Sequence, residues 1–378
     1  MPIGLYIHVP FCIKKCLYCD FTSYPLSGPA VKSYLESLIR EINLYGSALA
    51  DEDKIITSIF FGGGTPTTLP AASFKTVLNA VRSSFFLAAG CEVTVEANPG
   101  TVDGVGLTEL RQAGVNRLSI GVQSFHDRLL GVLGRIHSAA QAVQAVQLAR
   151  KAGFDNLNLD FIFGIPGQTN HDWRETLHRA VEMAPEHIAA YSLQLEEGTP
   201  LAQAAERGAI CACPEETELT MYRDAVAFLT AHGYSHYELS NFARPGRQCA
   251  HSLVYWLNQP YLGLGPAAHS LIKGVRFAND ISLAGYSDML SREEYPVENR
   301  TRLTAADEIS ETMFLGLRLT AGVDLNQFYR RFGRRAEDIY RNEIAGLIQK
   351  GLLEISEGSL RLTTKGLPLA NVVFREFV

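Results

Sequence analysis

Short apolar runs alternate with amphipathic segments over the first two thirds of the chain. The apolar runs have the length of buried strands and are bounded by turn residues, whereas residues 34–42 and 74–81 carry their apolar side chains at helical spacing. About six strand and helix units in alternation predict parallel strands in an open or incomplete barrel, an α/β fold of the (β/α)6 type. The expected strands cover residues 5–9, 58–61, 93–95, 118–120, 157–159 and 189–193.

The alternation ends near residue 235. Residues 234–269 are dense in Tyr, Trp, His and Gly, which favours a connector or a ligand-binding cap over another strand and helix unit. We therefore divide the chain into three parts. The expected domains are a core over residues 1–235, a connector or cap over residues 236–300 and a small C-terminal domain over residues 301–378.

The C-terminal part has the pattern of a small α+β domain. Thr304 is an expected helix N-cap with Asp307 three residues later, and residues 336–350 predict another helix that ends at Gly351. A β-hairpin is expected over residues 352–363. Helices followed by a hairpin are typical of a winged-helix-like module.

Composition narrows the class of partner. The 378 residues are 47% hydrophobic and 20% charged, as in an ordinary globular protein with one large and one small domain, and the net charge is −6. The C-terminal part carries eleven Lys or Arg against ten Asp or Glu, although four arginines cluster between residues 330 and 335. This balance does not favour nucleic acid as a partner, so we interpret the C-terminal module as a packing domain.

Cysteine usage and hydropathy predict a cytoplasmic protein without an integral membrane segment. The chain has seven cysteines, an odd number with three of them in one loop, which fits a reducing compartment better than a disulfide framework. The N-terminus lacks the basic and apolar pattern of a signal peptide, and no apolar run reaches the ~18 to 20 residues that a membrane-spanning helix needs.

The loop of Cys12, Cys16 and Cys19 carries the strongest chemical pattern. A Cys-x3-Cys-x2-Cys arrangement directly after the strand at residues 5–9 can give one thiolate to each of three irons of a [4Fe-4S] cluster, which leaves the fourth iron open to a small chelating molecule. The alternatives are a zinc site or unpaired core thiols. Zinc usually takes four ligands from paired clusters, and no second Cys or His pair with matching spacing is obvious.

A glycine-rich segment and a carboxylate follow the next two strands. Residues 62–66 read Gly-Gly-Gly-Thr-Pro, and consecutive glycines at a strand end let the backbone approach a ligand closely. Glu96 places a carboxylate at the following strand end, suited to a ribose or an ammonium group, with a solvated charge as the alternative. Together with the cysteine loop, these segments resemble the radical S-adenosylmethionine (SAM) superfamily, in which the methionine amine and carboxylate fill the open iron site.

Two longer stretches narrow the resemblance. Residues 114–125, with 134–137, and residues 160–169 resemble the family of oxygen-independent coproporphyrinogen III oxidases and their haem-chaperone relatives. The match extends to residues 237–243 and 361–366, so it covers essentially the whole chain. The resemblance implies cluster ligation by Cys12, Cys16 and Cys19, and SAM contacts for Tyr6, Tyr18, Gly63, Gly64, Thr65 and Glu96. It also implies contacts to SAM, partly to a second molecule of it, for Gln123, Arg135 and Asp160.

Two departures separate the branches of this family. The oxidase branch continues its cluster loop as Cys-x-Cys after a longer leader, whereas this chain has Phe21 two residues after Cys19 and starts its loop at residue 12. Residues 251–256, His-Ser-Leu-Val-Tyr-Trp, resemble the His-Asn-x-x-Tyr-Trp signature of the chaperone branch, with Ser252 in place of Asn. The resemblance therefore implies a protein that binds haem and passes it to an acceptor protein. The alternative is the oxidase reaction, in which a 5′-deoxyadenosyl radical takes hydrogen from the propionates of coproporphyrinogen III and decarboxylation follows.

Several side chains compete as the haem ligand. His251 is the first candidate, because imidazole is a common axial ligand of haem iron and Tyr255 and Trp256 beside it suit a flat macrocycle. A hydrogen-bonded core histidine is the alternative for this position, and His269 is a rival ligand. The remaining thiols are more typical of small hydrophobic positions: Cys211, Cys213 and Cys249.

Overall fold

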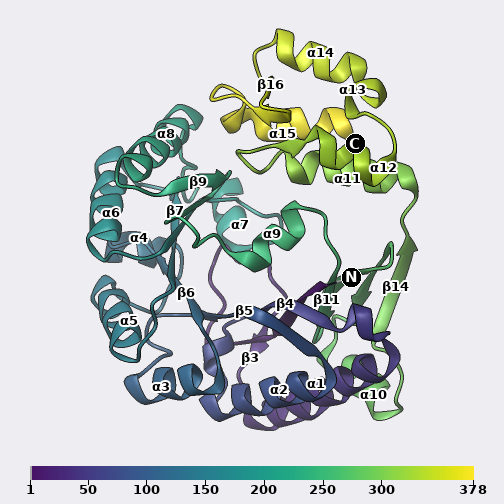
Figure 1. Cartoon of the computed structure of the whole chain (residues 1–378). Helices are drawn as coiled ribbons and strands as arrows, with labels where there is room; N and C mark the ends of the chain where they lie inside the picture. The colour runs from purple at the N-terminus through teal and green to yellow at the C-terminus, as the bar shows by residue number, and fades with distance from the viewer. Residues whose placement is uncertain (1) are drawn as a thin grey trace.

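The computed structural model describes residues 2–378 and is built around one twelve-stranded sheet (Figure 1). Six of its strands lie side by side in chain order and run parallel, as the sequence predicts. They curve into an incomplete barrel, which confirms the (β/α)6 core. These strands are β1 (Ile3–Val9), β4 (Ile55–Gly63), β5 (Phe86–Ala97), β6 (Arg117–Gln123), β7 (Leu157–Phe163) and β8 (His187–Ser192).

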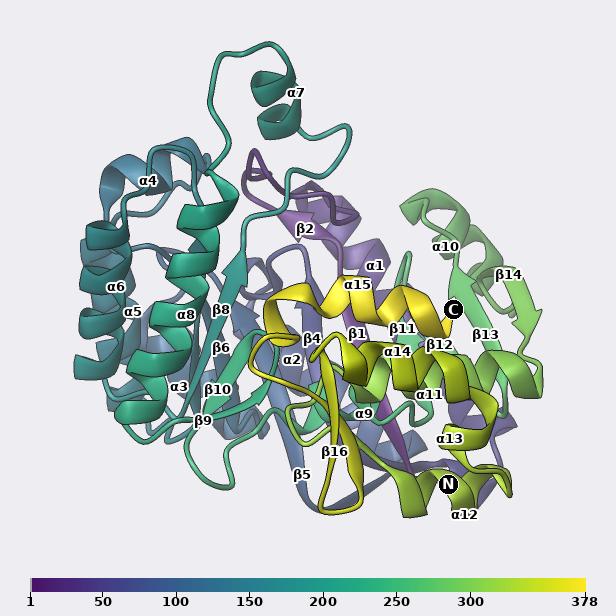
Figure 2. The ribbon, with the colours of Figure 1, turned by 90° about the horizontal axis from the view of Figure 1, so that it is seen from above.

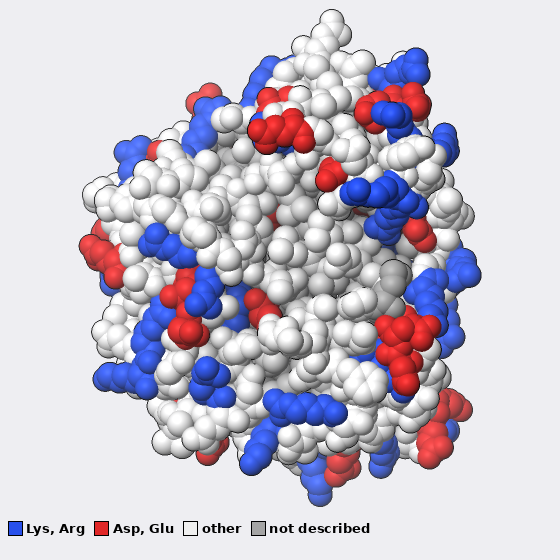
Figure 3. All heavy atoms as spheres, viewed as in Figure 1, with Lys and Arg blue, Asp and Glu red and all other residues white. Residues whose placement is uncertain are grey.

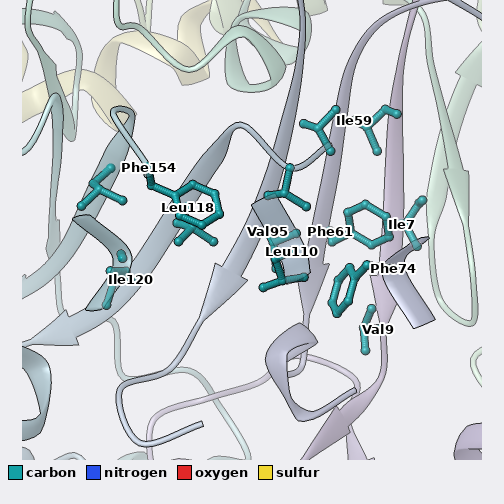
Figure 4. Close-up of a cluster of buried hydrophobic side chains, with 14 of the residues drawn as sticks. Ile7, Val9, Ile59, Phe61, Phe74, Val95, Leu110, Leu118, Ile120 and Phe154 are labelled. Carbon is teal, nitrogen blue, oxygen red and sulfur yellow. The ribbon is translucent and has the colours of Figure 1, made fainter. Parts of the chain in front are cut away.

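Helices cover the outer face of this barrel, except for α7, which lies beyond the strand ends on the side of the cysteine loop (Figures 1 and 2). Alternate strand residues point outward, so that Leu5 and Ile7 of β1 share one core with Tyr34 and Leu38 of the first helix. Figure 4 shows the same apolar layer along neighbouring strands. The helices are α1 (Gly28–Ala48), α2 (Ala71–Ser84), α3 (Gly104–Ala113), α4 (Asp127–Val132), α5 (Ala139–Lys151), α6 (Asn170–Glu182), α7 (Pro200–Glu206) and α8 (Glu215–Ala231).

The inner face of the barrel is polar. Glu92 of β5 and Arg117 of β6 lie 3.9 Å apart. The ring nitrogens of His187 in β8 meet Asn158 Oδ1 at 2.6 Å and the Tyr237 hydroxyl at 2.9 Å. The short helix α9 (Ala250–Trp256) contacts β1 and β4, and it lies at the end of the barrel opposite the cysteine loop (Figure 2). Polar side chains therefore line the inside of the barrel between the cysteine loop and α9.

The segment that follows α8, predicted from the sequence to be a connector or cap, contains several strands. Two strands extend the barrel beyond β8, while β11 pairs in parallel with β1 and begins an antiparallel extension on the other edge. The last of these strands is polar and mostly exposed, so no apolar run marks it in the sequence. The elements are β9 (Ser235–Glu238), β10 (Asn241–Ala243), β11 (Tyr261–Leu264), β12 (His269–Ile272), β13 (Val275–Asn279), α10 (Leu283–Ser291) and β14 (Val297–Arg302).

The C-terminal part is an α+β unit with its own buried core. Its first helix, α11 (Ala305–Gly316), starts with the reciprocal capping bonds of Thr304 and Asp307, as expected. The helix expected over residues 336–350 is two helices, because Tyr340 leaves the helical conformation at φ −112° and ψ 39°. The expected hairpin joins a three-stranded sheet. The remaining elements are β15 (Val323–Asp324), α12 (Leu325–Phe332), α13 (Ala336–Ile339), α14 (Arg341–Gln349), β16 (Leu353–Ser356), β17 (Ser359–Leu362) and α15 (Ala370–Phe374).

Candidate functional site

A cavity of about 490 Å³ opens at the carboxyl ends of the barrel strands, next to the cysteine loop. The loop lies between two short paired strands, β2 (Phe11–Cys12) and β3 (Tyr24–Pro25). Successive strand ends bring most of the predicted site residues together in the wall of this one cavity. They are Cys12, Cys16, Tyr18, Cys19, Gly63, Gly64, Thr65, Glu96, Gln123, Arg135 and Asp160.

The cysteine loop is held in place by its neighbours. Leu17 donates its backbone N–H to Leu133 O at 3.0 Å, and Leu201 donates to Leu17 O at 2.9 Å. In the described part of the chain, residues 2–378, no three His, Cys, Asp or Glu side chains converge on one ion position, as a zinc site would require. A cubane cluster needs a different arrangement, since each thiolate binds its own iron. Three thiols that line one cavity have the chemistry of cluster ligands.

The end of β4 approaches the cysteine loop so closely that only glycine fits. A Cβ on Gly64 would lie 2.6 Å from the carbonyl oxygen of Phe11. Gly63 has a φ of 105°, and a Cβ there would lie 2.5 Å from the ring of His8. The Gly64 N–H donates to Val9 O at 2.8 Å, which ties the glycine segment to β1. These glycines form a close cradle beside the thiols. Without side chains, they let a bound ligand or cofactor approach the protein backbone.

Glu96 and Asp160 place two carboxyl groups in the same cavity. Burial, and then the nearby Asp160, raise the pKa of Glu96 to about 8. Burial also raises the pKa of Asp160, although Asn158 Nδ2 and Ser119 Oγ donate to its two oxygens at 2.7 and 3.1 Å. Two half-buried carboxyl groups with raised pKa values favour a ligand with a cationic or hydroxyl group, because that ligand would stabilise their ionised forms.

Arg135 brings a cation to the same wall, beside the cysteines. Its Nη1 donates to Cys16 Sγ at 3.4 Å, and its Nη2 donates to Gly121 O at 2.8 Å and to Asn98 Oδ1 at 2.5 Å. Asn98 also lines the cavity, although it is not among the site residues predicted from the sequence. The signal that could have found it is its place one residue after the end of β5, at the edge where the other site residues gather.

Two predicted residues, Tyr6 and His251, lie inside the barrel and are not part of the cavity wall. Their rings stack with centroids 6.3 Å apart. His251 is 2% exposed, its Nδ1 meets Ser58 Oγ at 2.9 Å, and its Nε2 meets the Tyr255 hydroxyl at 3.0 Å. Burial and the nearby Arg117 lower the pKa of His251 to about 3, so the ring is neutral. In this conformation His251 is a hydrogen-bonded core histidine, and one of its two side-chain hydrogen bonds must break before the ring can ligate iron.

The other candidate haem ligands are scattered. His269 begins β12 and is exposed, and Cys211 is exposed on the segment between α7 and α8. Cys213 is half-buried on the same segment, whereas Cys249 is buried and its thiol donates to Glu92 Oε1 at 3.6 Å. The structure does not bring these side chains to one site.

The fold and the site together define the class of protein. A cysteine loop beside a glycine-rich strand end, at the open end of an incomplete (β/α)6 barrel, is the arrangement of radical SAM proteins, and this chain is one of them. Residues 6–180 match the model of the Radical SAM superfamily, and residues 303–369 match that of the HemN C-terminal domain. Membership of the superfamily implies a [4Fe-4S] cluster and SAM, and the thiols, the glycine cradle and the paired carboxyl groups fit both.

Similarity to known proteins narrows the class to one family. The chain is 37% identical to the heme chaperone HemW of Bacillus subtilis over 99% of this chain and 98% of that protein. It is 38% identical to HemW of Escherichia coli over 72% and 70% of the two chains. The solved structure of coproporphyrinogen III oxidase (HemN) from Escherichia coli is 26% identical, with a TM-score of 0.85 over 100% of this chain and 90% of that one. The chain belongs to the HemW family.

Proposed function

We propose that this protein is a haem chaperone, which binds haem and transfers it to an acceptor protein on a scaffold that carries a [4Fe-4S] cluster and SAM. The observation that carries the proposal is the 37% identity to a HemW chaperone over 99% of the chain. Phe21 supports it, because this side chain lines the cavity and is 62% exposed where the oxidase branch has a further cysteine.

The proposal assigns a role to each part of the cavity. Cys12, Cys16 and Cys19 ligate three irons, and Gly63, Gly64 and Thr65 approach the methionine end of SAM. Glu96 and Asp160 accept hydrogen bonds from ammonium or hydroxyl groups. The cluster that the three cysteine thiolates would hold would supply single-electron reduction chemistry to a bound SAM. The other predicted SAM contacts in the cavity wall are Tyr18, Gln123 and Arg135, whereas Tyr6, also predicted, lies outside that wall.

We propose that haem binds near α9, and that a hydrogen bond of His251 must first break. His251 can ligate iron only after the Ser58 or Tyr255 hydroxyl releases one of its ring nitrogens. Its neutral state suits a ligand, because a neutral imidazole keeps a lone pair for the metal. His269 is exposed and needs no such release, so it is the rival ligand. We also propose that the boundaries between the core, the connector and the C-terminal domain lie at residues 235 and 300.

The proposed setting is the cytosol, with a protein as the acceptor. All seven cysteines are free, which suits a reducing compartment. Across residues 2–378, no helix combines the length and the hydropathy needed to cross a bilayer. On the face shown in Figure 3, Lys and Arg are interspersed with Asp and Glu instead of forming one continuous cationic surface. We therefore do not propose nucleic acid as a partner.

The second candidate is the oxidase reaction, which the likeness to HemN over the whole chain favours. One anaerobic preparation with a reconstituted cluster separates the two functions when coproporphyrinogen III turnover and haem uptake are measured in parallel. We expect stoichiometric haem uptake and negligible turnover. Turnover on the order of 0.1 s⁻¹ or faster, the low end of enzymatic rates, would replace the chaperone function with the oxidase function.

The same assay tests the haem ligand. We expect His251→Ala to weaken haem uptake and to change the absorption spectrum of the bound haem, whereas His269→Ala should leave both unchanged. The opposite pattern would assign the ligand to His269. Unchanged uptake in both variants would remove both histidines as ligands and leave the chaperone function in place.

A further inference from the structure

A continuous chain of side-chain contacts connects two of the three cluster cysteines along the cavity wall. Cys12 Sγ lies 3.7 Å from Thr65 Oγ1, and Asn98 Nδ2 donates to Thr65 Oγ1 at 2.8 Å. Arg135 Nη2 donates to Asn98 Oδ1 at 2.5 Å, and Arg135 Nη1 donates to Cys16 Sγ at 3.4 Å. Asn98 is the middle member of this chain, so it acts on the two thiols through Thr65 and Arg135.

The amide of Asn98 has the chemistry that its position needs. It donates through Nδ2 and accepts through Oδ1, a combination that neither an ionised carboxylate nor an apolar side chain of the same size offers. Because Thr65 Oγ1 accepts from Asn98, the hydroxyl hydrogen of Thr65 remains available for Cys12 Sγ. Because Asn98 Oδ1 holds Arg135 Nη2, the planar guanidinium keeps Nη1 directed at Cys16.

The surrounding backbone holds Asn98 in this position. Its carbonyl oxygen accepts from the N–H and the hydroxyl of Thr101 at 3.0 and 2.7 Å, which closes a turn after β5. Gly121 leaves room for the contact, since a Cβ there would lie 3.0 Å from Asn98 Oδ1 and 3.2 Å from Arg135 Nη2. The Gly121 carbonyl also accepts from Arg135 at 2.8 Å. This series of side-chain contacts is therefore held in place by the fold and does not depend on flexible surface side chains.

We propose that Asn98 is a positioning residue that orients Thr65 and Arg135 as hydrogen-bond donors to Cys12 and Cys16, and that it thereby raises the reduction potential of the cluster. Reduction adds negative charge to the cluster, and donors and a cation beside its thiolates stabilise that charge. This inference rests on the cluster site proposed above, and it adds a residue outside the family resemblance to that site.

The test compares the wild type with Asn98→Ala, Asn98→Asp and a matched control, Asn116→Ala. Asn116 also uses both ends of its amide, accepting from the Val93 N–H at 2.8 Å and donating to Cys91 O at 2.9 Å, but it lies outside the cavity wall. Each full-length protein is reconstituted anaerobically without SAM. Iron and sulfide content give the cluster loading, and electron paramagnetic resonance at fixed solution potentials gives the ratio of reduced to oxidised cluster.

We expect full cluster loading in all four proteins. At a fixed potential, the ratio of reduced to oxidised cluster should be ~threefold or more lower in both Asn98 variants than in the wild type. The ratio in Asn116→Ala should match the wild type. Equal ratios in all four loaded proteins would overturn the role of Asn98 and leave the cluster site intact. Failure of the wild type to hold a cluster would instead refute the cluster site. Loss of the cluster from the two Asn98 variants alone would also overturn the tuning role, because Asn98 would then be needed for assembly.

Discussion

At the scale of single residues, the cavity keeps two carboxyl groups where burial opposes their ionisation. Glu96 is the second-last residue of β5, and its pKa is raised to about 8, first by burial and then by Asp160. In the unfolded chain the same carboxyl has its ordinary pKa of about 4.5. The ligand-free protein therefore binds a proton at Glu96 that the unfolded chain releases between these two values. The contribution of this proton to the stability of the fold is therefore fully present below pH 4.5. It is lost as the pH rises through the folded-state pKa of about 8.

We predict that Glu96→Gln removes this pH dependence. Between pH 6 and pH 9, the free energy of unfolding of the ligand-free wild type should fall by roughly 2 kcal/mol more than that of the variant, since one pKa unit is worth ~1.4 kcal/mol. Urea titrations at the two pH values measure the difference. Glu109→Gln, an exposed change on α3, should follow the wild type. Parallel profiles for wild type and Glu96→Gln would show that Glu96 is ionised in the ligand-free fold.

The sequence predicts cavity residues well when they belong to a short motif whose spacing indicates their chemistry. Cys12, Cys16 and Cys19 share a short motif, and the glycine segment follows a strand, so both could be assigned before the structure was known. Asn98 could not, because its role depends on Arg135, which the fold brings to it across 37 residues of chain. The burial of His251 depends equally on Ser58, which lies 193 residues away.

At the scale of elements, α1 is fastened to the far edge of the sheet by one buried carboxyl. Glu41 accepts from the Gly265 N–H at 2.8 Å, from Asn279 Nδ2 at 2.6 Å and from the Tyr286 hydroxyl at 2.6 Å. These donors come from the loop after β11, from β13 and from α10. The apolar spacing of residues 34–42 predicts α1, but from the sequence alone Glu41 would be placed at the solvent. Its burial depends on donors from elements much later in the chain.

We predict that Glu41→Ala destabilises the protein by about 3 kcal/mol or more, because it leaves three buried donors without their acceptor. Tyr286→Phe removes only one of the three donors and should cost roughly 1 to 2 kcal/mol. Denaturant unfolding measures both. Glu36→Ala, at an exposed position of the same helix, should stay within about 0.5 kcal/mol of the wild type. A cost for Glu41→Ala as small as that control would mean that water replaces the carboxylate.

At the scale of the whole molecule, the C-terminal unit has a hydrophobic core separate from the main core of the barrel, and Leu239 of the barrel part packs against it beside several polar contacts. Arg276 of β13 holds Glu311 of α11 through two bonds of 2.5 and 2.9 Å, and Leu239 donates its N–H to Arg318 O at 3.2 Å. The sequence predicts an α+β C-terminal unit correctly from its own pattern. Its attachment could not be predicted, because the partner strand β13 belongs to a segment without a clear apolar run. Because the C-terminal unit has its own core, weakening the contacts between the two parts should release it as one unit.

Release of that unit should leave the cavity unchanged. The cavity wall is built entirely from residues 12–196, whereas α11 contacts α9, at the opposite end of the barrel (Figure 2). Arg276 is 36% exposed, so Arg276→Gln should weaken docking by only about 1 kcal/mol, or roughly fivefold in the undocked population. Hydrogen exchange should rise in residues 303–369, while cluster loading and SAM affinity match the wild type. Arg292→Gln, which breaks an exposed pair with Asp288 at 3.1 Å, should change neither. A drop in SAM affinity in Arg276→Gln would instead mean that the two ends of the barrel are energetically coupled, so that an acceptor protein bound at the C-terminal unit could control the cluster end.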